Sequence, residues 1–114
     1  MTAMAQRTWV AVCPVESVPR GDGVAALLDN GEQVAIFRTE SDEFHGLSNM
    51  DPFSGAAVLS RGIVGDADGV AVVASPVYKQ RFELSTGACL DDENVRVRTY
   101  PVRIAGGVVH VGSP

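Results

Sequence analysis

Histidine and cysteine, which bind transition metals and serve in nucleophilic catalysis, are few among the 114 residues of this sequence. The histidines are His45 and His110, and the cysteines are Cys13 and Cys89, without CxxC spacing. Zinc usually needs three or four Cys, His or carboxylate ligands. We therefore expect each imidazole to be half-buried or on the surface, and Cys13 to be a small core residue. A nucleophile built on Cys89 with a distant histidine remains open as the least favoured alternative.

Two aspartates in the segment GDADG (65–69) match the opening of a calcium-binding loop. A complete calcium loop needs further oxygen ligands and a distal bidentate glutamate, and none follows Asp66 and Asp68 at that spacing. We therefore predict a solvated turn between two strands here. No glycine-rich loop opens a helix, so the sequence gives no support to a phosphate cradle.

Two other segments place four polar side chains at the spacing of a metal site. "NMD" contains Asn49 and Asp51, and "SPVY" contains Ser75 and Tyr78 with a proline directly after the serine. A Gly-Asp pair at 65–66 lies between the segments, and FELSTG (82–87) adds an aromatic residue and a Thr-Gly turn. The spacing suits two ligand loops, but the side chains are an amide, a carboxylate, a hydroxyl and a phenol.

This frame resembles the two cluster-binding loops of the Rieske ferredoxin family, over the range Trp9 to Val111. In that family the loops carry Cys-x-His and Cys-x-x-His, so that two thiolates hold one iron and two imidazoles the other. The resemblance places Asn49 and Ser75 at the cysteine positions, and Asp51 and Tyr78 at the histidine positions. A phenol would have to lose a proton with a pKa of about 10 to bind iron. We therefore expect no cluster, metal or other cofactor in this chain.

The residues that replace the ligands follow a recognisable pattern of their own. N-x-D-P-F, VLSRG, SP-x-x-KQRF and L-S-x-G-x-C are similar to the pattern of the small subunits of cytoplasmic NAD(P)H-dependent assimilatory nitrite reductases. The resemblance implies an oxidoreductase subunit that has no catalytic residue of its own. It would support, by docking, a large subunit that carries FAD, an iron–sulfur cluster and sirohaem and reduces nitrite to ammonium.

The two loops hold the candidate contacts for that large subunit. Aromatic and arginine side chains are the usual hot spots of protein interfaces. The candidates are the rigid, aromatic and basic residues Pro52, Phe53, Pro76, Tyr78, Lys79, Gln80 and Arg81.

Alternative roles stay open at this point. Phe53 and Tyr78 would fill the space of a cluster if the tyrosine ring packed inward and its hydroxyl found a polar partner. A Rieske-fold interaction module unrelated to nitrite is a second functional class, and a true Rieske electron carrier is a less favoured third.

Short strands must position these loops. Asp-Asn-Gly at 29–31 separates two apolar runs and predicts a β-hairpin, and VAVVAS (70–75) predicts a strand buried on both faces. The apolar side slips by one residue between Val97 and Tyr100, which predicts a bulge at 99–101. We expect an all-β, Rieske-like small β-sandwich or barrel of about eight or more short antiparallel strands, with the two loops at the former cluster tip.

Length and charge limit the remaining possibilities. The chain is of single-domain size, and we expect a loose tail at 1–6 and one Rieske-like domain over 7–114. A net charge of −5 argues against a nucleic-acid partner. No apolar run approaches the roughly 20 residues of a membrane helix, and the first residues lack the pattern of a signal peptide. We therefore expect a cytoplasmic protein with reduced thiols and no membrane partner.

Overall fold

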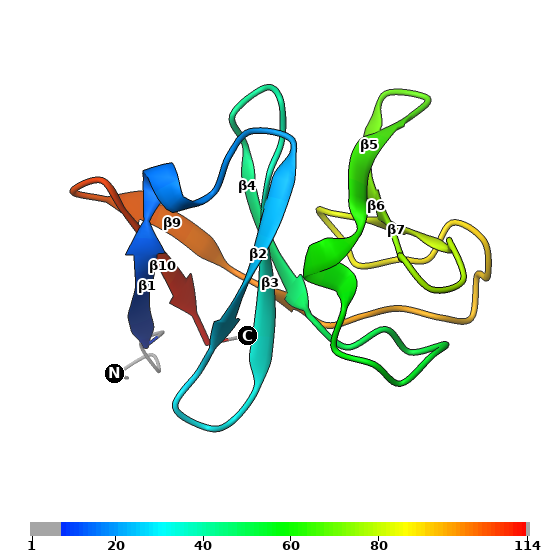
Figure 1. The fold of residues 1–114 in the computed structure, drawn as a ribbon, viewed down its shortest axis with the longest axis horizontal. Helices are drawn as coiled ribbons and strands as arrows, with labels where there is room; N and C mark the ends of the chain where they lie inside the picture. The colour runs from blue at the N-terminus through cyan, green and yellow to red at the C-terminus, as the bar shows by residue number, and fades with distance from the viewer. Residues whose placement is uncertain (1–7, 114) are drawn as a thin grey trace, which may run out of the picture.

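Antiparallel strands form nearly all of the regular structure in residues 8–113, the part of the chain that the computed structural model describes (Figure 1). The elements in chain order are β1 (Trp9–Pro14), η1 (Val15–Ser17), β2 (Asp22–Leu27), β3 (Gln33–Arg38), β4 (Phe44–Ser48), η2 (Leu59–Arg61), β5 (Ile63–Ala67), β6 (Val70–Ala74), β7 (Arg81–Glu83), β8 (Thr99–Tyr100), β9 (Val102–Ala105) and β10 (Val108–Gly112). Both helices in this range are single 3-10 turns, and neither is long and apolar enough to cross a membrane. The expected all-β class is confirmed, whereas the expected tail at 1–6 lies outside the described residues.

The strands form three sheets of three, four and three strands. Their orders are β1-β10-β9, β2-β3-β4-β8 and β5-β6-β7. In Figure 1 the four-stranded sheet stands in the middle, with β1, β9 and β10 on one side and β5 to β7 on the other. The last sheet, together with the loops around it, positions the candidate site.

Strand β3 separates two hydrophobic cores. Successive side chains of a strand point to opposite faces, and Val34 and Ile36 enter one core while Ala35 and Phe37 enter the other. All four are fully buried, which explains why this strand has a continuous apolar run. The first pair packs against β10, and the second against Val73 and Phe82 of the sheet that carries the loops.

The two predicted turns between strands are present. Strands β2 and β3 pair from Leu27 opposite Gln33 outward, and Gly31 in their loop has a φ of 88°. The calcium-like segment is the β5–β6 turn, where Asp66 Oδ2 accepts a hydrogen bond from the Gly69 N–H at 3.0 Å. The prediction for β6 was only partly right, because Val72 and Val73 are buried but Val70 at its start is exposed.

The predicted bulge at 99–101 is wrong. The chain instead changes sheets at Pro101: β8 pairs with β4, whereas β9 pairs with β10. Val97 accordingly packs in the core next to the loops, and Tyr100 packs in the opposite core. A proline suits this junction because it has no N–H to leave unpaired in a ladder.

Candidate partner-binding site

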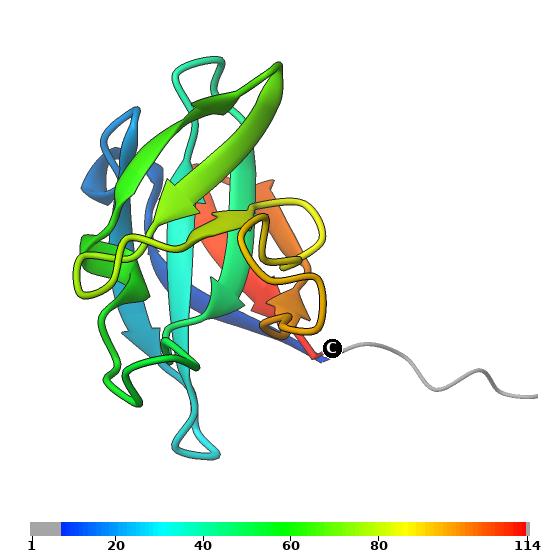
Figure 2. The same ribbon diagram turned by 90° about the vertical axis from the view of Figure 1, so that its right-hand side faces the viewer.

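The four former ligand positions lie in two loops at the end of the molecule formed by β5 to β7 (Figures 1 and 2). The first loop (49–58) connects β4 to η2, and the second loop (75–80) connects β6 to β7. The second loop is closed by a hydrogen bond from the Ser75 N–H to the Gln80 carbonyl at 2.9 Å and by one from the Lys79 N–H to the Ser75 carbonyl at 3.1 Å. Lys79 needs a φ of 69° to complete this tight turn.

Asn49 fixes the base of the first loop. Its side-chain oxygen accepts a hydrogen bond from the Ser60 N–H at 2.7 Å, and its amide donates to Gln33 Oε1 at 3.0 Å and to the Ala57 carbonyl at 3.2 Å. The residue is almost fully buried. A buried amide that satisfies both its own groups and two backbone groups is a structural anchor.

Asp51 and Ser75 join the two loops. The Ser75 hydroxyl donates to Asp51 Oδ2 at 2.5 Å, and both residues are fully buried. The second carboxylate oxygen, Oδ1, accepts a hydrogen bond from the Phe53 N–H at 2.9 Å. Burial alone would raise the pKa of Asp51, but the hydrogen bonds from Ser75, Phe53 and Ser54 outweigh it and hold this pKa below its usual value. The carboxylate is therefore charged at neutral pH.

The two aromatic side chains of the loops point in different directions. Phe53 is half-buried against the core, with its ring centroid 6.2 Å from that of Phe82. Tyr78 is 60% exposed. Phe53 therefore packs inward, whereas the inward packing that the space-filling alternative requires of Tyr78 is wrong, because Tyr78 is mostly exposed on the tip of the second loop.

The remaining expected contact residues differ in solvent exposure and in the hydrogen bonds that they make. Pro52, Lys79 and Arg81 are exposed, and Pro76 and Gln80 are half-buried. Arg81 is held by Asp91 in a two-point ion pair, with Nη2–Oδ1 at 2.9 Å and Nε–Oδ2 at 3.3 Å. The ammonium of Lys79 donates to the carbonyl of Pro76 at 2.9 Å. Both cations, Lys79 in the second loop and Arg81 at the start of β7, thus have partners within the chain.

The residues at the four positions do not fit a [2Fe-2S] cluster. None is a thiol or an imidazole, and the polar side chains of Asn49, Asp51 and Ser75 are engaged by one another or by the backbone. Between residues 8 and 113 no group of three or more His, Cys, Asp or Glu side chains could hold a metal ion. The arrangement can support a surface between the two loops.

Comparison with known proteins gives the same family at the level of sequence and of fold. Residues 8–112 match the Rieske-like [2Fe-2S] domain family. The nitrite reductase (NADH) small subunit of Salmonella typhimurium is 47% identical over 104 residues, which are 90% of this chain and 95% of that protein. A crystal structure from Mycobacterium tuberculosis, described as an NADH-dependent nitrite reductase small subunit, superposes with a TM-score of 0.91 at 47% identity, covering 96% of this chain and 97% of that one. The chain belongs to the nitrite reductase small-subunit family.

One further relative of this family has a different length. The nitrite reductase [NAD(P)H] large subunit of Klebsiella oxytoca is 41% identical over 111 residues, which are 97% of this chain but 11% of that protein. A domain like this small subunit therefore exists inside a much longer polypeptide in that organism.

Sequence reasoning missed two exposed apolar residues beside the motif positions of this small subunit. Met50 lies between Asn49 and Asp51 and is 46% exposed, and Val77 precedes Tyr78 and is 43% exposed. The sequence feature that could have identified them is an apolar residue between polar residues within a loop. We call the exposed residues of the two loops that carry a side chain, which leaves out the exposed Gly55, the tip surface: Met50, Pro52, Val77, Tyr78 and Lys79.

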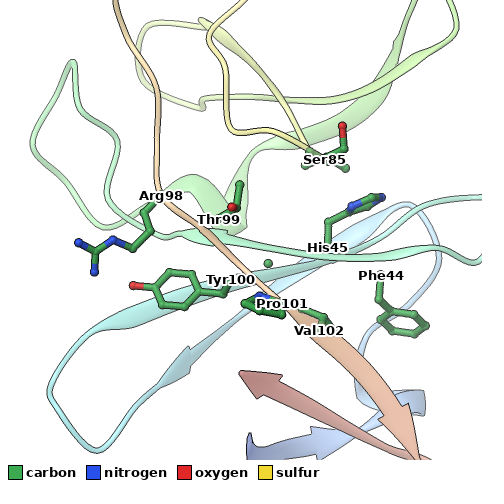
Figure 3. Close-up of a pocket in the computed structure, with 10 residues that line it drawn as sticks. Phe44, His45, Ser85, Arg98, Thr99, Tyr100, Pro101 and Val102 are labelled. Atoms are coloured by element: carbon green, nitrogen blue, oxygen red, sulfur yellow. The ribbon is translucent and has the colours of Figure 1, made fainter. Parts of the chain in front are cut away.

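An open hollow of about 550 Å³ lies away from the four ligand positions, where β4 and the β8–β9 junction meet the turn after β7 (Figure 3). His45 lines it beside Ser85 and Thr99. The Nε2 atom of His45 is shielded from solvent and has no hydrogen bond among the described residues, and Glu43 Oε1 lies 3.7 Å away. The expectation of a half-buried imidazole at this position is confirmed.

The cysteine-based enzyme gains no support from this small-subunit structure. Cys89 is buried in the core that contains Phe82 and Val97, out of reach of a substrate. Cys13 is half-buried, and burial raises the pKa of its thiol. His110 points its Nδ1 at the Val108 carbonyl, 3.1 Å away.

Proposed function

We propose that this chain is the cluster-free small subunit of a cytoplasmic NAD(P)H-dependent nitrite reductase and that its tip surface docks onto the large catalytic subunit. The observation that carries the proposal is the match to nitrite reductase small subunits over nearly the whole chain. Nitrite reduction to ammonium then takes place on the large subunit, with FAD, an iron–sulfur cluster and sirohaem bound there. The two free cysteines are compatible with a reducing compartment.

The tip surface has the chemistry of a docking site. Its apolar members Met50, Val77 and Tyr78 come from two different loops and are all exposed. Because Asp91 already neutralises Arg81, we expect the contact to depend mainly on apolar and aromatic groups, which typically dominate the centre of an interface. Lys79 is then the one charged member of the tip surface without a carboxylate partner in the described residues, so docking should depend on salt concentration only to the extent of this single charge.

The relative from Klebsiella oxytoca supports the choice of partner. In a protein named as the large subunit, a domain similar to this chain is part of the same polypeptide. Covalent linkage places such a domain at high effective concentration next to the rest of that enzyme. A separate small subunit needs a docking surface to reach the same position.

The test measures the affinity of the full-length chain for the intact, cofactor-loaded large subunit. We expect Tyr78→Ser to weaken binding by about 30-fold or more, which corresponds to the roughly 2 kcal/mol of an interface hot spot. Val77→Ser should weaken it by about fivefold, or roughly 1 kcal/mol. Ile104→Ser is the matched control, because Ile104 has the same 43% exposure as Val77 but lies on β9, on the far side of the central sheet (Figure 1).

Two results would count against the proposal. Wild-type protein that fails to bind the large subunit, or to raise its NAD(P)H-dependent nitrite reduction, would remove the subunit role. If Ile104→Ser weakens binding as much as Val77→Ser, the docking surface lies elsewhere.

A further inference from the structure

Core packing alone does not require a hydrogen bond between Ser75 and Asp51. This bond spans 24 residues of sequence and joins the two loops that supply the tip surface. A charged carboxylate without exposure is costly unless it is hydrogen-bonded, and an apolar pair of the same volume would fill the space at less cost. What a short bond to a carboxylate adds is a fixed distance and direction between two segments.

Each member of the pair also fixes the backbone of its own loop. Asp51 Oδ1 accepts from the N–H of Phe53, two residues on, and Ser75 Oγ accepts from the N–H of Val77 at 3.3 Å, also two residues on. Side chains that bond the backbone two residues ahead set the direction in which a turn starts. Pro52 lies inside the first of these turns, and Val77 completes the second.

We infer that Asp51 and Ser75 are positioning residues for docking: their hydrogen bond ties the two loops together where a cluster would otherwise do so, and thereby presets the tip surface. This inference rests on the proposed function. In a cluster-bearing relative of the fold, one inorganic group holds both loops through four ligands. Here one buried hydrogen bond between two of the four positions holds them.

The expected effect follows from population arithmetic. When a bound shape is only a fraction of the free ensemble, the apparent dissociation constant rises by the inverse of that fraction. If loss of the bond lowers the docking-competent fraction to roughly a third or a tenth, the affinity falls by about 3- to 10-fold.

The experiment compares Ser75→Ala, Asp51→Asn and the double variant with the wild type at a temperature where all are folded. The readouts are affinity for the intact large subunit and amide hydrogen exchange in 50–58 and 76–80. Ser75→Ala should bind about 3- to 10-fold more weakly and exchange faster in both loops. Asp51→Asn, which keeps an acceptor oxygen, should lose less. The double variant should lose no more than Ser75→Ala, because both changes remove the same hydrogen bond between the loops.

A control variant tests the loss of a hydroxyl–carboxylate hydrogen bond at an exposed position away from the two loops. Ser85→Ala removes another serine hydroxyl bonded to a carboxylate, Glu83 Oε2 at 3.0 Å, outside the two loops. It should leave both the affinity and the exchange of the loops unchanged. Should Ser75→Ala fail to fold, the same two measurements on Asp51→Asn decide the question.

The outcomes distinguish this inference from the function on which it rests. If Tyr78→Ser weakens binding but Ser75→Ala and Asp51→Asn bind like Ser85→Ala, the docking role stands and the positioning role is overturned. If Ser75→Ala lowers only the unfolding midpoint, with affinity and loop exchange unchanged, the pair is merely structural. If neither Tyr78→Ser nor Ser75→Ala changes binding, docking through this tip is itself overturned.

Discussion

Replacing Asn49 with alanine tests whether the former thiolate position has become a structural anchor. The substitution removes the acceptor for the Ser60 N–H at 2.7 Å and the donor to the Ala57 carbonyl at 3.2 Å. Gln33 is exposed and can turn to water, so its loss should count little. Each buried polar group left without a partner costs about 1–3 kcal/mol.

We therefore expect Asn49→Ala to lower the free energy of unfolding by roughly 2–4 kcal/mol: about 1–3 for the N–H of the buried Ser60, and about 1, the low end, for the carbonyl of the half-buried Ala57. Urea unfolding followed by circular dichroism measures this directly. Small proteins have denaturant slopes of about 1–3 kcal/mol per molar, so the midpoint should fall by roughly 1.5 M.

The control is Asn94→Ala, an exposed asparagine in the loop before β8. It should change stability by no more than about 0.5 kcal/mol, as ordinary surface substitutions do. If Asn49→Ala also stays within that range, the hydrogen bonds of Asn49 contribute nothing net, and the argument that it anchors the first loop is refuted.

Three further predictions follow from the same structure. Gly87→Ala and Gly69→Ala both carry the left-handed backbone cost of about 1–3 kcal/mol. A Cβ at Gly87 would also lie 2.1 Å from the Val97 carbonyl oxygen, whereas a Cβ at Gly69 would meet open space, so Gly87→Ala should lower the urea midpoint more than Gly69→Ala. Equal urea midpoints for the two variants would contradict this clash. The folded-state pKa of Asp51 is lowered, so its stabilisation is complete above the unfolded value of about 3.9 and is lost as the pH falls through the lower folded value. The stability gap between wild type and Asp51→Asn should therefore stay constant above about pH 5 and shrink as the pH falls below about 4. A gap that stays constant below about pH 4 would speak against this prediction. Protein purified without oxygen should be colourless and hold far less than one iron per chain by metal analysis, whereas stoichiometric iron in a reddish-brown sample would replace docking by electron transfer.

Much of the fold is readable from the sequence because turn chemistry is local. Asn30-Gly31 and Gly106-Gly107 stand between apolar runs, and glycine tolerates the positive φ values found at three of these residues. The motifs of the two ligand-like loops can be read from sequence in the same way, and together with the segments around them they predicted the Rieske-like fold that the comparisons and the structure confirm.

The sequence by itself determined which side chains replace the cluster ligands, because that depends only on identity and spacing. Only the tertiary structure decided what they do: Ser75 meets Asp51 across 24 residues, Arg81 meets Asp91, and Tyr78 turns to solvent. Such pairings depend on the distance between segments that are remote along the chain, which local pattern does not encode. The change of sheet at Pro101 could not be predicted for the same reason. A one-residue slip in the apolar pattern is expected both for a bulge within one sheet and for a chain that passes from one sheet to another.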